Sequence, residues 1–224
     1  MRNQTLKTLL GFAFHPWNQR FRNDLIVGAP AWVDTDRFDV VAKAPSNLPP
    51  RECFFSGYCV PQKALALMLQ TLLEQEFKIA HHEEQRPTDV YALVVAKGGI
   101  KFQKAAGSGE RNCQRIVGGS DNPAAKGLSS IQAGSVCANM TMEDFAGLLA
   151  EMAPAYLDRP VVDLTGLTGA YDFKLVWTGA ALLDQGGITV FEAMEKQLGL
   201  KLETRKLPMS ATVIDHIEKL ADDN

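Results

Sequence analysis

One stretch of the chain, residues 158–177 (DRPVVDLTGLTGAYDFKLVW), constrains the fold more than any other part. Two valines are followed by two Thr-Gly steps, and every second residue over 171–177 is then aromatic or leucine. Alternation with a period of two is typical of a half-buried strand, and glycine supplies the positive φ that tight turns need. The stretch therefore predicts a strand, a turn at Gly166 and Gly169, and a second strand that returns as a hairpin. We expect Phe173 and Trp177 to belong to the core.

Apolar residues at helical spacing predict four helices, and strand-like segments follow each of them. The expected helices cover residues 5–14, 62–77, 141–156 and 190–198, and Thr141 and Thr189 are the expected N-caps of the last two. Besides the opening stretch, the expected strands cover residues 24–27, 37–43, 78–84, 89–97, 201–205 and 211–217. The turns Arg86-Pro87-Thr88 and Leu207-Pro208 separate the strands of two expected hairpins.

The repeated unit of one helix and two strands predicts an α+β fold, in which antiparallel sheets carry helices packed on one face. We expect two αββαββ halves, residues 1–110 and residues 135–224. A connecting loop rich in glycine, serine and asparagine is expected over residues 98–134. A single compact domain is the alternative.

The four cysteines occur as two pairs, each placed where a disulfide would close a surface loop. Cys53 and Cys59 lie in a loop rich in proline and glycine, and Cys113 and Cys137 bracket the glycine-rich segment. Disulfides that close surface loops are typical of exported proteins. Four free thiols in a cytosolic protein are the alternative, and a zinc site is disfavoured because no C-x₂-C spacing occurs.

Composition excludes some partners. The net charge is −3 and no block of like charge occurs, so we expect no nucleic-acid partner. No apolar run approaches the roughly 18 residues of a membrane span, so no transmembrane segment is expected. The first residues do not form a signal peptide. If the protein is exported, we expect that a leader has been removed ahead of residue 1.

Three polar residues lie on or beside the expected hairpin: Asp163, Tyr171 and Asp172. Carboxylates and a phenol at the mouth of a hairpin are suited to binding a cation or a polar ligand. Alternatively, Asp163 caps the Thr-Gly turn and Asp172 faces solvent, because aspartate at turns usually bonds the local backbone.

Three histidines are further candidates. His81 and His82 belong to the segment HHEE, whose composition is the most metal-like in the chain. Side chains two apart on a strand share a face, but a metal site needs a third ligand from another segment. His216 follows Asp215, which points to the opposite face, so His216 would need a carboxylate such as Asp163 or Asp172. Solvated strand faces are the alternative for all three histidines.

The chain resembles a family of soil-associated proteins of unknown function that occur in large paralogous sets in Acidobacteria. The resemblance is carried by RFDVVAKAP, MLQTLLEQEFKIAHHEEQRPTDVYALVVAKGG, CANMTMEDFAGLLAEMA, RPVVDLTGLTGAYDFKLVW and GGITVFEAMEKQLGLKLETRKLPMSATVIDHIEK. Members of that family look like exported proteins, and similar domains follow membrane metallopeptidases of the BlaR sensor type. The resemblance implies an extracytoplasmic location, and the family carries no established activity.

No nucleophile-elbow, zincin or P-loop motif occurs in the sequence. We therefore expect an extracytoplasmic (periplasmic or secreted) binding or interaction module that needs no cofactor. Its partner would be a protein or small molecule in the envelope or outside the cell, and exposed edge strands would dock it by strand addition. The alternative is a hydrolase with a carboxylate–histidine or metal-assisted site, built from His81 or His82 with Asp163, Asp172 and His216.

Overall fold

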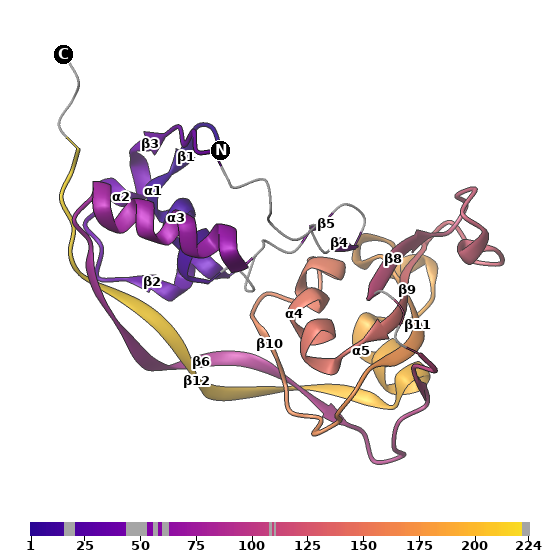
Figure 1. The fold of residues 1–224 in the computed structure, drawn as a ribbon. Coiled ribbons are helices and arrows are strands. Elements are labelled where there is room, and N and C mark those ends of the chain that lie inside the picture. Colours follow the sequence, from indigo (N-terminus) through magenta and orange to yellow (C-terminus); the bar gives the residue numbers. More distant parts are fainter. Residues whose placement is uncertain are drawn as a thin grey trace. The chain divides into compact units, whose positions relative to one another are not determined.

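A computed structural model describes residues 1–15, 21–43, 53–55, 58–59, 63–107, 109 and 111–220, with the backbone alone at residues 22, 53–55, 58–59 and 63. The described residues form two compact units (Figure 1). Unit 1 takes its residues from 1–52, 60–88 and 207–224, and unit 2 from 53–59 and 89–206. Two long strands, β6 (Ala80–Val95) and β12 (Leu200–His216), contribute residues to both units.

Unit 1 is mainly helical. Its elements are β1 (Gln4–Thr5), α1 (Leu6–Phe14), the 3₁₀ helix η1 (Arg22–Leu25), β2 (Ile26–Val27), α2 (Trp32–Thr35), β3 (Arg37–Phe38) and α3 (Lys63–Glu76). The Thr5 side chain caps α1 by accepting a hydrogen bond from the backbone N–H of Thr8. In Figure 1, α1, α2 and α3 lie together. Apolar side chains of α1 pack with Leu73 of α3 and Ile214 of β12 in one core. The expected helices 5–14 and 62–77 are thereby confirmed.

Unit 2 contains the remaining elements. These are β4 (Cys53–Phe55), β5 (Tyr58–Cys59), β7 (Gln103–Lys104), β8 (Asn112–Val117), the 3₁₀ helix η2 (Pro123–Ala125), β9 (Gln132–Met140), α4 (Met142–Met152), β10 (Val161–Asp163), β11 (Tyr171–Thr178), the 3₁₀ helix η3 (Ala180–Gln185), α5 (Val190–Ala193) and the π-helical turn η4 (Met194–Leu198). The predicted caps are present, because Thr141 starts α4 and Thr189 starts α5. Gly199 ends η4 in the left-handed conformation.

The main sheet of unit 2 has the strand order β7-β11-β9-β8 and is antiparallel. The alternation predicted for β11 is confirmed, because Tyr171, Phe173, Leu175 and Trp177 are all buried. Asp172 and Lys174, between them, are exposed. Phe145 of α4 packs its ring against Phe173 with centroids 4.7 Å apart, so this face of β11 belongs to the core.

The hairpin expected over residues 158–177 is not formed, although its two strands are present. β10 pairs in parallel with β6, and β11 pairs with β9 and β7. The glycines between the strands do have the predicted backbone, with φ of 68° at Gly166 and 95° at Gly169. The segment between β10 and β11 therefore leads the chain from one sheet to another, and the glycines turn it on the way.

The two other expected hairpins are also wrong. Residues 80–95 form one strand that runs through Pro87, and residues 200–216 form one strand that runs through Pro208. Proline fixes φ near −65°, which an extended backbone accepts, and it removes only one donor. β6 and β12 are neighbours in a sheet of order β10-β6-β12-β2. Each proline thus lies inside a strand instead of at a turn.

The segment 98–134, expected as a connecting loop, contains β7, β8, η2 and the first residues of β9. Unit 1 draws on both ends of the chain and unit 2 on the segments between them, and the division into halves 1–110 and 135–224 stays a prediction. The mixed α+β class, with antiparallel and mixed sheets, is confirmed, and the internal repeat stays a prediction. Among the described helices, none is long and apolar enough to cross a membrane.

Candidate functional site

A hollow on unit 2 brings three segments together. It has a volume of about 360 Å³, within the range of small-molecule sites. Its lining comprises Lys101, Phe102, Gln103, Lys104, Ala106, Asp172, Phe173, Lys174, Gln197 and Leu198. These residues come from β7 and the residues around it, from the start of β11, and from the end of η4. Asp172 is the one candidate from the sequence analysis that lines it.

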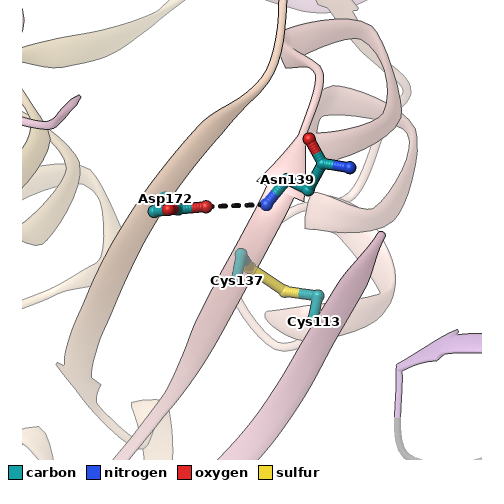
Figure 2. The surroundings of a disulfide bond; sticks show 4 residues. All are labelled: Cys113, Cys137, Asn139 and Asp172. Carbon is teal, nitrogen blue, oxygen red and sulfur yellow. Dashed lines mark hydrogen bonds between the residues drawn. A yellow bond between two sulfur atoms is a disulfide. The ribbon is translucent and has the colours of Figure 1, made fainter. Parts of the chain in front are cut away.

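An irregularity in the sheet orients Asp172. Tyr171 pairs with Met140 and Phe173 with Cys137, so two residues of β9 oppose the single residue Asp172. Such a bulge leaves a backbone group of the longer strand without its ladder partner. The Asp172 carboxylate accepts that hydrogen bond from the backbone N–H of Asn139 over 2.8 Å (Figure 2). Asn139 has φ 53°, a left-handed conformation that asparagine tolerates better than most residues.

A disulfide lies on the other side of β9. Cys113 of β8 and Cys137 of β9 are direct register partners, and their sulfur atoms are bonded (Figure 2). Both residues are buried, with exposed fractions of 0% and 1%. The predicted bridge between these two cysteines is confirmed, but it links adjacent strands. In the second pair, the backbones of Cys53 and Cys59 are register partners, and the predicted bridge between them lies outside the described residues.

Three lysines surround the hollow, and two of them have partners in the protein. Lys101 donates to the carbonyl oxygens of Glu195 and Lys196 over 3.2 and 3.1 Å, which caps the end of η4. Lys174 donates to the carbonyl oxygen of Ala124 over 2.9 Å. Lys104 is exposed, and within the described part of the chain its ammonium has no hydrogen-bond or ion-pair partner.

Neutral groups complete the walls of the hollow. The Gln197 side chain bonds both backbone groups of Val176, accepting from its N–H over 2.9 Å and donating to its carbonyl over 2.6 Å. These two hydrogen bonds fix η4 against β11. The half-buried ring of Phe102 packs on Tyr171 at 5.2 Å and on Phe173 at 5.6 Å between centroids. The hollow therefore has a rigid aromatic wall beside its ammonium groups.

The charges at this site favour an anion. The lining holds three lysines and one aspartate, and the aspartate carboxylate already accepts a hydrogen bond from the protein backbone. Ammonium groups bind carboxylate and phosphate oxygens through charge-assisted hydrogen bonds. A planar ring next to them offers apolar contact for the rest of a ligand. The arrangement is suited to holding a ligand.

The other candidates on unit 2 have local structural contacts. The Asp163 carboxylate accepts from the backbone N–H of Thr165 over 2.9 Å, the turn-capping interaction named as its alternative role. The Tyr171 ring is buried, and its hydroxyl donates to the carbonyl of Thr168 over 3.0 Å. Both contacts hold the segment between β10 and β11.

The three candidate histidines lie in unit 1 and bond three different carboxylates. His81 Nε2 is 3.0 Å from Glu74, His82 Nδ1 is 2.8 Å from Asp215, and His216 Nε2 is 3.3 Å from Glu218. His82 and His216 are exposed, whereas His81 is partly buried and packs its ring edge-on against Phe14. Within the described residues, no three His, Cys, Asp or Glu side chains are grouped as a metal site would require.

A further polar cluster in unit 1 was not anticipated from the sequence. The buried hydroxyl of Thr212 donates to Glu83 over 2.7 Å and lies 3.0 Å from His15 Nε2. Burial lowers the pKa of His15 below its usual 6.5, against opposing effects of the Glu83 charge and the Leu25 backbone. Burial would raise the pKa of Glu83, but hydrogen bonds from Ser210 and Thr212 outweigh it, and the pKa lies below the usual 4.5.

No sequence signal identifies this cluster, because its members come from three distant segments and belong to no motif. The hollow on unit 2 is likewise built from segments that are distant in the sequence. Lys101 and Lys104 are separated from Lys174 by some seventy positions in the sequence, and their proximity depends on the pairing of β7 with β11.

Comparison with curated proteins found no match, and comparison with solved structures found none either. A family model described as "Protein of unknown function (DUF3738)" matches residues 7–217, nearly the whole chain. The chain therefore belongs to the DUF3738 family of proteins of unknown function.

Proposed function

We propose that this protein is an extracytoplasmic binding module that holds its ligand, without chemical conversion, in the lysine-lined hollow of unit 2. The observation that carries the proposal is the lining itself. Ammonium groups, an amide and an aromatic ring meet in one hollow of about 360 Å³. The strands, η4 and the backbone contacts of Asp172 and Gln197 hold these groups in place. A site fixed in this way loses little entropy when a ligand binds.

The extracytoplasmic location is supported by the Cys113–Cys137 bridge. Both cysteines are buried in register on adjacent strands, and persistent disulfides are typical of oxidising compartments. The resemblance to exported acidobacterial proteins, including domains attached to BlaR-type metallopeptidases, points to the same location. Fractionation of the native host, with thiol labelling of the protein before and after reduction, tests this part. A cytosolic protein with reactive Cys113 and Cys137 would contradict it.

The binding role is tested by ¹H–¹⁵N NMR on the whole chain with a library of small polar fragments. We expect saturable shifts of backbone amides at residues 101–106, 172–174 and 197–198, and unchanged fragments after prolonged incubation. Fragments that bind only elsewhere, or that are converted to products, would contradict the proposal.

A hydrolase remains a second candidate, and one observation favours it. His82 and Asp215 form an exposed imidazole–carboxylate pair at 2.8 Å, an arrangement that orients a histidine for general base catalysis. Turnover of an ester or peptide that is lost in both His82→Gln and Asp215→Asn would support this candidate. A stoichiometric transition metal in the purified protein, released by His82→Gln, would favour the metal-assisted form.

A further inference from the structure

The hollow on unit 2 has an unequal distribution of charge. Lys101, Lys104 and Lys174 line it, and Asp172 is its one carboxylate. The Asp172 carboxylate is directed at the backbone N–H of Asn139 (Figure 2). A positive potential in a concave site attracts anions and raises their local concentration.

Lys104 differs from the other two lysines. Lys101 and Lys174 are tied to backbone carbonyls, whereas Lys104 has no such partner among the described residues and sits on β7, opposite Tyr171. Its ammonium therefore has all three N–H groups available for a ligand. Lys101 uses two of its three N–H groups on η4, which leaves one for the same ligand.

Phe102 supplies the apolar part of the site. Its ring is packed on both Tyr171 and Phe173, so it is fixed although it is only half-buried. Fixed aromatic rings contact flat apolar groups at little entropic cost. A ligand that spans Lys104 and Phe102 would thus carry an anionic group beside a flat apolar group.

We infer that the hollow binds a small anionic ligand that carries a flat apolar moiety, with Lys104 contacting the anion and Phe102 the apolar moiety. This inference rests on the proposed binding function and adds the chemical class of the ligand. Carboxylates and phosphates share the required chemistry, so the experiment includes both.

The test is an NMR titration of the whole chain with phenyl phosphate, benzoate, inorganic phosphate and benzyl alcohol. We expect phenyl phosphate or benzoate to saturate the hollow, and their relative affinity tells which anion is preferred. Inorganic phosphate lacks the ring and benzyl alcohol lacks the charge, so each should bind at least about fivefold more weakly. Raising the salt concentration should weaken the anionic probes alone, because salt screens exposed charges.

Lys104→Gln should weaken the anionic probe about fivefold or more and leave benzyl alcohol unaffected. Lys206→Gln is the matched control, because Lys206 is an exposed lysine of unit 2 outside the hollow, and it should change nothing. Lys104 is exposed and unpartnered within the described chain, so the variant should keep the parent spectrum elsewhere.

Benzyl alcohol that binds the hollow as tightly as phenyl phosphate would overturn the inference and leave the binding function standing. Probes that all fail at a hollow where other fragments bind would also overturn it. A hollow that takes neither probes nor fragments would defeat the binding function itself.

Discussion

The hydroxyl of Thr212 donates a hydrogen bond to the Glu83 carboxylate over 2.7 Å, and Thr212 is fully buried. A hydroxyl has one proton to give. The same oxygen lies 3.0 Å from His15 Nε2, a contact in which the imidazole donates when its proton is on Nε2. The three residues link the end of α1 to β6 and β12 within unit 1.

Acid should destabilise unit 1, with His15 responding first. Burial lowers the pKa of folded His15 below its ordinary 6.5, so the unfolded chain binds more protons below pH 6.5. The His15 contribution to stability is complete above pH 6.5 and is lost as the pH falls from there towards the folded pKa. Urea unfolding of wild type and His15→Gln across this window checks the prediction. Identical pH dependence in the two proteins would contradict it.

Glu83 should respond at lower pH. Its pKa is lowered from 4.5 in the folded state, so the stabilisation it provides is present above pH 4.5 and is lost as the pH falls below that value. Glu83→Gln should remove this loss of unfolding free energy below pH 4.5 in the same series of urea measurements. A decline that persists in the variant would assign it to other carboxylates.

Removing the Thr212 hydroxyl should be costly. Thr212→Val keeps the shape of the side chain but leaves Glu83 and His15 without the group between them. Losing a hydrogen bond to a charged group costs about 1.5–3 kcal/mol of unfolding free energy. Thr212→Ser is the matched control, because it retains the hydroxyl and loses one methyl group. Urea denaturation should rank wild type first, Thr212→Ser second and Thr212→Val last.

Reduction of the Cys113–Cys137 bridge should destabilise unit 2. The two cysteines are 24 residues apart in sequence, and closing a loop of this size stabilises by about 3–4 kcal/mol in the chain-entropy model. The double variant Cys113→Ala, Cys137→Ala should lose the same amount and become insensitive to reductant. Wild-type protein whose urea midpoint is unchanged by reductant would show that the bridge does not stabilise the fold.

The contrast between β11 and the long strands shows which features a sequence pattern can predict. The burial of Tyr171, Phe173, Leu175 and Trp177 follows from their alternation, because side chains two apart share a face wherever the strand pairs. The caps at Thr141 and Thr189 are equally local. Such features depend on neighbours a few positions away, and they were predicted correctly.

Strand partners depend on distant residues, and the predicted strand pairs are wrong. The sequence predicts a turn at Pro87, since proline commonly ends strands, but Pro87 lies within β6, and β6 is the neighbour of β12. β10 pairs with β6 instead of with the nearby β11, since no local pattern encodes which strand lies next to it. The candidate site has the same origin, because β7, β11 and η4 must first come together before Lys104 can lie in one hollow with Asp172 and Gln197.

Trp177 should be among the most costly residues of unit 2 to truncate. Its side chain is 4% exposed and lies in phase with Leu175, which is fully buried. Trp177→Ala should lower the free energy of unfolding by about 3–5 kcal/mol, since it leaves a cavity in a packed core. Trp177→Phe keeps an aromatic ring and should cost clearly less. Equal losses in the two variants, measured by urea denaturation, would mean that ring volume is not what stabilises this position.

Backbone geometry and free space make separable demands on the two glycines between β10 and β11. Gly166 and Gly169 have φ of 68° and 95°, and an added methyl group would meet no atom within 4 Å at either position. Any loss of stability in Gly166→Ala or Gly169→Ala therefore comes from the backbone conformation. We expect each variant to lose about 1 kcal/mol of unfolding free energy. Gly147 is the control, because it is exposed within α4 and has equal free space.

Gly147→Ala should raise stability by up to about 1 kcal/mol, because alanine favours a helix that glycine weakens. Opposite signs at Gly166 and Gly147 in the same urea assay would confirm that positive φ, and not crowding, selects glycine between β10 and β11. If Gly166→Ala and Gly169→Ala unfold like the parent while binding at the hollow weakens, the two glycines serve ligand access and the geometric explanation falls.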